Sequence, residues 1–174
     1  FDHLELQGCR AGILGFGAIG RETARLFRAN GMEVWVYDPF VTRAQAEALD
    51  CRYCAGLPEL LGQCQILSLH MPSLPSTYHM LDQAAFDAML DGVYLVNCAR
   101  GTVIDEAALY AALKSGKVAA AGLDVMEREP FDPENPLLSL PNVIVTPHVA
   151  GVTAQAAERT HALVVRSTLS LLEG

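Results

Sequence analysis

Residues 11–20, Ala-Gly-Ile-Leu-Gly-Phe-Gly-Ala-Ile-Gly, decide the fold of this chain. They join a short apolar run to a segment with helical periodicity, 19–30, so a GxGxxG pattern lies between a predicted strand and a predicted helix. In this context Gly15 permits a tight turn, Gly17 lets the backbone approach a pyrophosphate, and Gly20 lets the helix pack closely on the strand. The anion would lie against the free N–H groups at the start of the helix, so the stretch predicts a dinucleotide site.

An acidic residue at the end of the next apolar run indicates which dinucleotide is bound. Asp38 comes 18 residues after Gly20, close to the spacing expected for the acid that binds the adenine ribose. Its carboxylate would accept hydrogen bonds from the ribose hydroxyls and repel a 2′-phosphate, which favours NAD over NADP. Arg43 is a counter-signal, because a nearby arginine can accept that phosphate. Ala18 and Ile19, between the glycines, complete the predicted cofactor loop.

Away from this motif, short apolar runs alternate with longer amphipathic segments. The runs are nearly continuously apolar, as in strands that are covered on both faces. The predicted strands are 11–16, 33–38, 51–54, 65–70, 94–99, 119–125 and 143–146. The predicted helices are 19–30, 42–49, 58–61, 83–90, 106–115 and 153–172. This alternation predicts an α/β fold, a Rossmann-type doubly wound parallel sheet in three layers, in a single domain spanning 1–174.

Composition and charge exclude several classes of protein. The chain has 174 residues and a formal net charge of −8, without a cluster of lysine or arginine, so we expect no nucleic-acid partner. No apolar stretch is long enough to cross a membrane, and residues 1–5 lack a signal-peptide pattern. The odd number of scattered cysteines, five, indicates reduced thiols and a cytoplasmic location. Cys51 and Cys54 form a CxxC without a second ligand pair, so we expect no metal.

Three polar residues, Arg100, Glu129 and His148, each follow a different predicted strand. Because ligands of an open parallel sheet bind beyond the carboxyl ends of its strands, we expect all three at the edge that carries the glycine loop. Reduction of a 2-keto acid needs a cation for the carboxylate, a proton donor for the developing alkoxide, and a group that orients the donor. Arginine, histidine and glutamate are suited to these three roles.

Taken together, these motifs resemble the D-isomer-specific 2-hydroxyacid dehydrogenases over nearly the whole chain. The matching segments are 15–20, Asp38-Pro39, His70-Met71-Pro72, Asn97-Cys98-Ala99-Arg100-Gly101, Gly122-Leu123-Asp124-Val125, Glu129-Pro130 and Thr146-Pro147-His148-Val149-Ala150-Gly151. Several independent motifs in one order are much more specific than a single glycine loop.

The resemblance implies roles for individual residues. It implies that Arg100 binds the carboxylate and carbonyl of the substrate, that His148 exchanges the proton, and that Glu129 hydrogen-bonds this histidine. It places Asp124 near the nicotinamide carboxamide. The cofactor-binding set that it implies is Gly15, Gly17, Ala18, Ile19, Gly20, Asp38, Pro39, His70, Pro72, Cys98, Ala99, Asp124, His148 and Gly151. Ala18 departs from the family, in which many members have arginine at this position.

The same resemblance implies a second, substrate-binding domain that this chain lacks, and a homodimer formed through the NAD-binding domain. We therefore expect hydride transfer between NAD(H) and a small D-2-hydroxy or 2-keto acid, such as 3-phosphoglycerate, glycerate/hydroxypyruvate or lactate. The 174 residues alone should have at most trace activity. Two alternatives share the scaffold. One is a formate dehydrogenase, disfavoured because that branch lacks the acid at Glu129, and the other is an NAD-sensing transcriptional corepressor.

Overall fold

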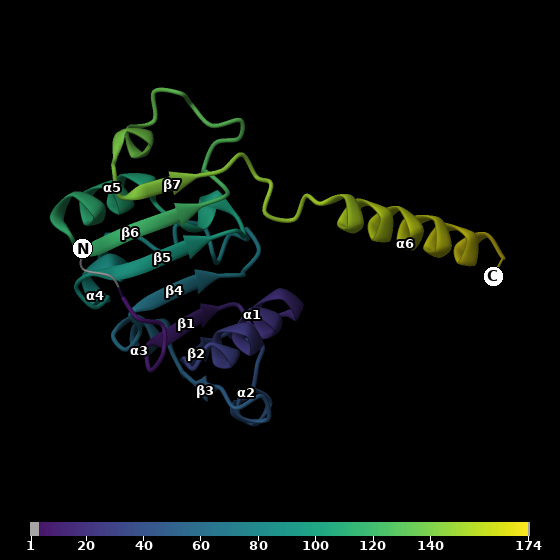
Figure 1. The fold of residues 1–174 in the computed structure, drawn as a ribbon, viewed down its shortest axis with the longest axis horizontal. Coiled ribbons are helices and arrows are strands. Elements are labelled where there is room, and N and C mark those ends of the chain that lie inside the picture. The colour runs from purple at the N-terminus through teal and green to yellow at the C-terminus, as the bar shows by residue number, and fades with distance from the viewer. Residues whose placement is uncertain (1–3, 174) are drawn as a thin grey trace.

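The computed structural model describes residues 4–173, and its core is a seven-stranded, entirely parallel sheet (Figure 1). The order across the sheet is β3-β2-β1-β4-β5-β6-β7. The strands are β1 (Arg10–Leu14), β2 (Glu33–Tyr37), β3 (Arg52–Tyr53), β4 (Ile66–Leu69), β5 (Val93–Asn97), β6 (Val118–Leu123) and β7 (Val143–Val145). The direction of travel along the sheet reverses between β3 and β4, so the crevice beyond the carboxyl ends of β1 and β4 is the expected ligand site.

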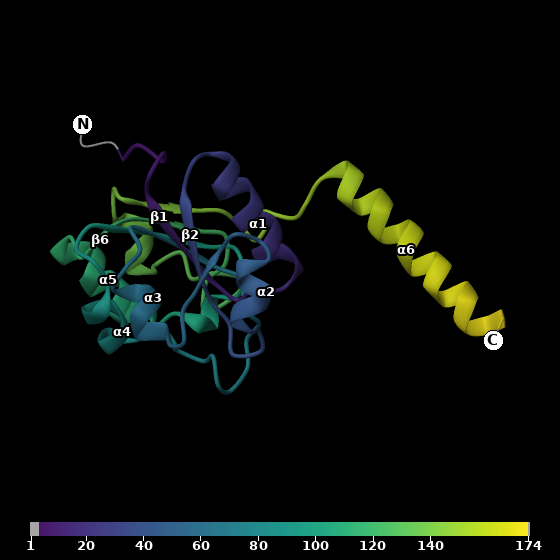
Figure 2. The same cartoon turned by 90° about the horizontal axis from the view of Figure 1, so that it is seen from below.

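Helices lie on both faces of the sheet (Figure 2). They are α1 (Ala18–Ala29), α2 (Arg43–Glu47), α3 (Leu57–Leu61), α4 (Gln83–Ala88), α5 (Glu106–Ser115) and α6 (Ala154–Glu173), with 3-10 turns η1 (Gly101–Val103) and η2 (Pro136–Ser139). Neighbouring residues of β1 belong to different cores because side chains alternate along a strand. Ile13 packs with residues of α1 and α2, whereas Leu14 packs with residues of α3, α4 and α5.

The predicted doubly wound fold is confirmed, and the predicted helix boundaries agree within a few residues. Asp82 caps α4 and Asp105 caps α5 through side-chain bonds to backbone N–H groups. Gly116 ends α5 in the left-handed conformation, φ 80°. The helix predicted over 83–90 ends early at Ala88, because Met89 is already extended. The strand predicted over 51–54 shortens to Arg52–Tyr53, and the two 3-10 turns were not predicted.

The expectation that every strand is covered on both faces is wrong for β5, β6 and β7. In residues 4–173, the face of these strands on the α1 side carries no helix and forms a shallow apolar groove. Ile144 is 73% exposed on this face, and Tyr94 and Gly122 also line it. α1 and α2 lie over the other half of the sheet because they connect β1, β2 and β3.

The last helix, α6, stands apart from the body of the domain (Figure 1). Its side chains are exposed along almost its whole length, including Leu163, Val164, Leu169 and Leu172. No helix among residues 4–173 combines the length and apolarity that a membrane crossing requires.

Candidate cofactor and catalytic site

The glycine loop between β1 and α1 has the geometry of an anion site. Gly15 has φ 92°, and a Cβ on it would lie 2.8 Å from the carbonyl carbon of His70. A Cβ on Gly20 would lie 2.1 Å from the Gly15 carbonyl oxygen, so helix and strand could not approach as they do. Gly17 faces open space, and as the N-cap of α1 it makes no side-chain hydrogen bond. The first N–H groups of α1 are therefore open to a ligand, and no acidic side chain in the first turn opposes an anion.

Asp38 is held beside this loop at the end of β2. One carboxylate oxygen accepts the Phe16 N–H at 2.7 Å, and the other accepts the Phe40 N–H at 2.8 Å. Asp38 lines a cavity of about 350 Å³ together with Gly15 and Gly17. This cavity also places the predicted residues Pro39, His70 and Pro72 around one space.

His70 follows β4 and is half-buried, with its Nε2 2.9 Å from the Ser68 hydroxyl. Burial lowers the pKa of this imidazole. The neutral ring is therefore favoured at the cavity wall, which agrees with a lining role rather than proton transfer.

The segment after β5 carries the predicted residues Cys98, Ala99 and Arg100. The buried Asn97 side chain shapes it, accepting the Ala99 N–H and donating to the Arg100 carbonyl oxygen, each at 3.0 Å. Cys98 is exposed, and the exposed Arg100 donates from Nη1 to the Ala99 carbonyl at 2.6 Å. Arg100 forms no ion pair among residues 4–173, so its guanidinium can take a carboxylate ligand.

The structure brings the predicted pair of His148 and Glu129 together. His148 Nδ1 lies 2.8 Å from a carboxylate oxygen of Glu129, and the two side chains are 49% and 40% exposed. Because a carboxylate only accepts, this contact places a proton on Nδ1 and leaves Nε2 for a reacting group. Both residues line a cavity of about 290 Å³ with Phe131. His148 has a left-handed backbone, φ 55°, which is a strained conformation for a residue with a Cβ.

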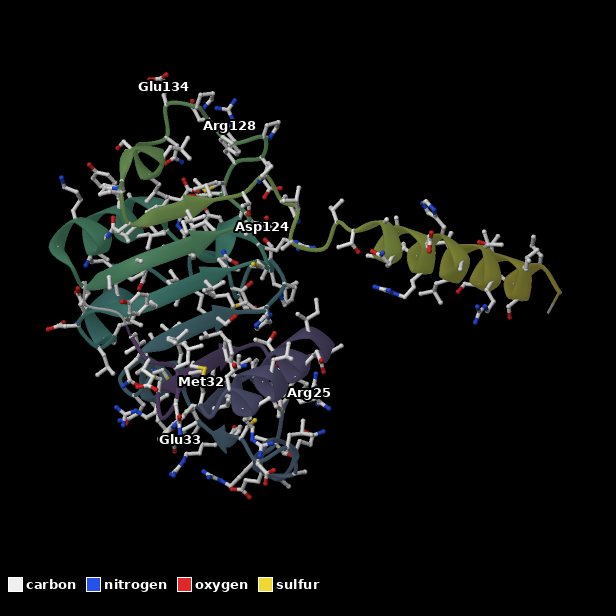
Figure 3. The ribbon with its side chains drawn as sticks, viewed as in Figure 1. Arg25, Met32, Glu33, Asp124, Arg128 and Glu134 are labelled. Atoms are coloured by element: carbon white, nitrogen blue, oxygen red, sulfur yellow. The ribbon has the colours of Figure 1, made fainter. Side chains whose placement is uncertain are left out.

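Asp124, at the end of β6, organises the loop that carries His148 (Figure 3). Its carboxylate accepts the Thr146 hydroxyl at 2.5 Å, the Val149 N–H at 2.9 Å and the Ala150 N–H at 2.8 Å. Its carbonyl oxygen accepts the His148 N–H at 2.8 Å. Burial by itself raises the pKa of Asp124, but the hydrogen bonds from Thr146, Ala150 and Val149 outweigh it, and the pKa lies below its usual value.

The remaining predicted residues lie at the same edge of the sheet. Ala18 and Ile19 are exposed in the first turn of α1, with Ile19 72% exposed. Gly151 is exposed after the His148 loop, and a Cβ on it would meet nothing within 4 Å. The described residues hold no group of three His, Cys, Asp or Glu that could bind a metal ion.

Several residues of the larger cavity were not predicted from the sequence. They are Tyr37, Phe40, Met71, Leu74, Ser76, Thr77 and Met80. Most come from the segment between β4 and α4, which has no regular secondary structure. Thr77 holds this segment in place, since its hydroxyl donates to the Pro72 carbonyl at 2.7 Å and accepts the Leu74 N–H at 2.8 Å. Clustered Pro, Ser and Thr were the available signal of a shaped loop.

Comparison with known proteins agrees with this geometry. Residues 1–150 match the family described as D-isomer specific 2-hydroxyacid dehydrogenase, NAD binding domain. The chain therefore belongs to this family of NAD-binding domains.

Individual relatives show the range of activities on this scaffold. D-3-phosphoglycerate dehydrogenase of Archaeoglobus fulgidus is 41% identical over 174 residues, which are 100% of this chain and 33% of the relative. Hydroxypyruvate reductase of Thermotoga maritima is 46% identical over 158 residues, 89% of this chain and 50% of the relative. A crystal structure of a glyoxylate reductase from Paecilomyes thermophila superposes with a TM-score of 0.90 at 38% identity, covering 98% of this chain and 51% of that one. The chain thus spans a third to about half of the relatives that it matches.

Proposed function

We propose that the protein containing this chain is an NAD-dependent oxidoreductase that interconverts a small D-2-hydroxy acid and its 2-keto acid. The observation that carries the proposal is the His148–Glu129 contact of 2.8 Å at the same sheet edge as the open glycine loop. A cofactor loop alone would fit many dinucleotide-binding proteins. A histidine paired with a carboxylate beside it adds the means of moving a proton.

The residues at this edge divide the chemistry among them. NAD(H), when bound, carries the hydride that is exchanged with the carbon of the hydroxyl or carbonyl group. Arg100, whose guanidinium is exposed and has no carboxylate partner in the described residues, binds the carboxylate of the acid with two parallel N–H bonds. His148 gives its Nε2 proton to the carbonyl oxygen during reduction and takes it back during oxidation. Glu129 holds the ring orientation and stabilises the imidazolium that forms.

The cofactor contacts follow from the two halves of the site. Gly15, Gly17, Ala18, Ile19 and Gly20 would hold the pyrophosphate through the uncapped start of α1. The adenosine side is formed by Asp38, Pro39, His70 and Pro72, which line one cavity. The nicotinamide side is formed by Cys98, Ala99, Asp124, His148 and Gly151, which lie beyond β5, β6 and β7.

We expect the substrate to be an acid of the kind that the relatives are named after, which include 3-phosphoglycerate, hydroxypyruvate and glyoxylate. We infer that the side chain of the acid is selected by a second domain outside residues 1–174. We also infer that the protein forms a homodimer through the NAD-binding domain. The apolar groove on β5, β6 and β7 is an argument for the dimer, because a second copy of the chain could cover it. All five cysteines are free, which fits the reducing cytoplasm.

The test is NADH oxidation by the full-length protein with glyoxylate, hydroxypyruvate, pyruvate and 3-phosphohydroxypyruvate. We expect turnover with at least one of these acids, in the ordinary enzyme range of about 1–10³ per second. The 174-residue chain should bind NADH and turn over at no more than trace rates, because hydride transfer needs an enclosed, water-free substrate position. Full-length protein that binds NADH and reduces none of these acids would contradict the proposal.

A further inference from the structure

The loop that carries Glu129 has little structure of its own. Residues 127–135 are mostly exposed and belong to no helix or strand. Inside the loop the described contacts are two hydrogen bonds of 2.9 Å, from the Asn135 N–H to the Asp132 carbonyl and from the Glu134 N–H to the Asp132 carboxylate, and an exposed Arg128–Asp132 ion pair at 3.8 Å. Besides its contact with His148, Glu129 accepts the Met126 N–H at 3.4 Å, a long bond from the first end of the loop. The position of Glu129 therefore depends largely on how the two ends of the loop are attached to the domain.

One side chain is attached to both ends. Glu106, the first residue of α5, accepts the Glu127 N–H on one carboxylate oxygen at 2.7 Å. Its other oxygen accepts the side-chain amide of Asn135 at 2.6 Å. The helix that presents it is fixed by buried residues such as Leu109 and Leu113, so the carboxylate is a rigid clamp across the base of the loop.

We propose that Glu106 is a positioning residue for proton transfer, which clamps the loop 127–135 so that Glu129 reaches His148. The inference rests on the proposed function for its catalytic meaning, whereas the clamp itself is a matter of geometry. Glu106 touches neither His148 nor either cavity, so it acts only through the loop.

The ordinary reason for an acid at a helix start is already met by its neighbour. Asp105 caps α5, accepting the N–H groups of Ala107 and Ala108 at 2.9 and 3.1 Å. An acid in the first turn also interacts favourably with the helix dipole, but that would not require contacts with a distant loop. Both oxygens of Glu106 instead bond residues 21 and 29 positions away.

A second contact makes the expected effect partial. The Glu127 side chain accepts His79 Nε2 at 2.8 Å and the Tyr78 hydroxyl at 3.3 Å, so the start of the loop has another anchor. At the other end, the Asn135 side-chain amide bonds Glu106, while its side-chain oxygen accepts the Leu137 N–H of η2 at 3.0 Å. Loss of the clamp should therefore loosen the loop without detaching it.

The first test reads the His148 ring in the 174-residue chain by nitrogen-15 NMR, above the pH at which the ring is protonated. In the wild type, the Glu129 carboxylate holds the neutral ring in the Nδ1–H form. Glu106→Gln leaves one oxygen for two donors, so its amide must face either the Glu127 N–H or the Asn135 side-chain amide. The ratio of Nδ1–H to Nε2–H forms should then fall about fivefold, the factor of one net hydrogen bond. Adding Asn135→Asp restores a donor–acceptor pair and should restore the ratio.

Three comparisons control this experiment. Glu134→Gln removes a carboxylate of the same loop that has no described side-chain contact and projects outward (Figure 3), so it should leave the ratio unchanged. His161, in the exposed helix α6, should keep its spectrum in every variant. Glu106→Asp keeps the charge but shortens the reach, and it provides a second reading if Glu106→Gln folds poorly. An unchanged ratio in Glu106→Asp and Glu106→Gln, or no rescue by Asn135→Asp, would overturn the clamp.

The second test asks whether the clamp affects the reaction rate of the full-length protein. Glu106→Gln should lower kcat, leave the Kd for NADH unchanged, and have little further effect when Glu129→Gln is already present, because both act through one contact. Effects that multiply independently would overturn the proposal. If the wild type reduces no 2-keto acid, the proposed function fails, while the NMR result still decides whether Glu106 positions Glu129.

Discussion

Asp124→Asn tests the idea that one buried carboxylate organises the loop carrying His148. Asp124 is 4% exposed in the wild type, and its carboxylate accepts three hydrogen bonds, from Thr146, Val149 and Ala150. Asparagine has one oxygen, so its amide group must face at least one backbone N–H of the loop. An unsatisfied donor of this kind costs about 1–3 kcal/mol, and the exposed loop lets water offset part of that cost. We expect the free energy of unfolding to fall by about 1–3 kcal/mol.

The acid dependence gives a second, independent reading of the same side chain. Hydrogen bonding holds the pKa of Asp124 below its usual value in the folded protein. A group with a depressed folded pKa contributes stability that is fully present above its unfolded pKa, which is about 4, and is lost as the pH falls through the folded pKa. The stability difference between wild type and Asp124→Asn should therefore be constant above about pH 5 and shrink below about pH 4.

Urea unfolding followed by the fluorescence of Trp35 measures both quantities on the 174-residue chain. Asp91→Asn is the matched control, because the Asp91 side chain is 90% exposed and its ion pair with Lys117 lies at the surface. The control should change stability by less than about 1 kcal/mol. A change for Asp124→Asn no larger than for the control, or a difference that persists unchanged in acid, would refute the assigned role.

Three further variants test the site in the full-length protein. Asp38→Ala should weaken the binding of NAD by about 1–3 kcal/mol and reduce the preference for NAD over NADP, because the ribose hydrogen bonds and the repulsion of a 2′-phosphate are lost together. Titration with both cofactors measures the two affinities. An unchanged ratio of these affinities would exclude Asp38 from the cofactor site. Arg100→Lys should raise KM for the keto acid and lower kcat, because lysine lacks the two-pronged grip on a carboxylate; loss of NADH binding with KM preserved would make Arg100 a cofactor residue. Glu129→Gln removes the carboxylate that orients the His148 ring, so kcat for reduction should fall while the Kd for NADH stays unchanged. An unchanged kcat would argue against the pair.

The sequence predicted those parts of the site that depend on local geometry. The glycine spacing in 15–20 specifies a tight turn and a close helix–strand contact, and the contact at Gly20 is with the Gly15 carbonyl of the same motif. The edge shared by Arg100, Glu129 and His148 also followed, because a parallel sheet gathers the carboxyl ends of its strands. These predictions needed the order of strands and helices but no side-chain contacts.

The parts that were missed depend on contacts between distant segments. Glu106 and Asn135 are 29 residues apart in the sequence, and neither belongs to a motif from which the contact could be predicted. Asp124 was assigned by resemblance to the nicotinamide, whereas its anchoring of the loop at Thr146 appears only in three dimensions. The bare face over β5, β6 and β7 was also missed, since an apolar run does not reveal whether a helix covers both of its sides.

Because α6 extends away from the domain, a small rotation at its start produces a large displacement at its far end. Its 20 residues extend roughly 30 Å at 1.5 Å per residue, and the helix begins only a few residues after the His148 loop (Figure 1). A rotation of about 10° where the helix begins would displace its far end by about 5 Å over this length. Small rearrangements around His148 are thereby magnified at a distance, where a pair of spectroscopic labels, one on α6 and one on the sheet, can resolve them.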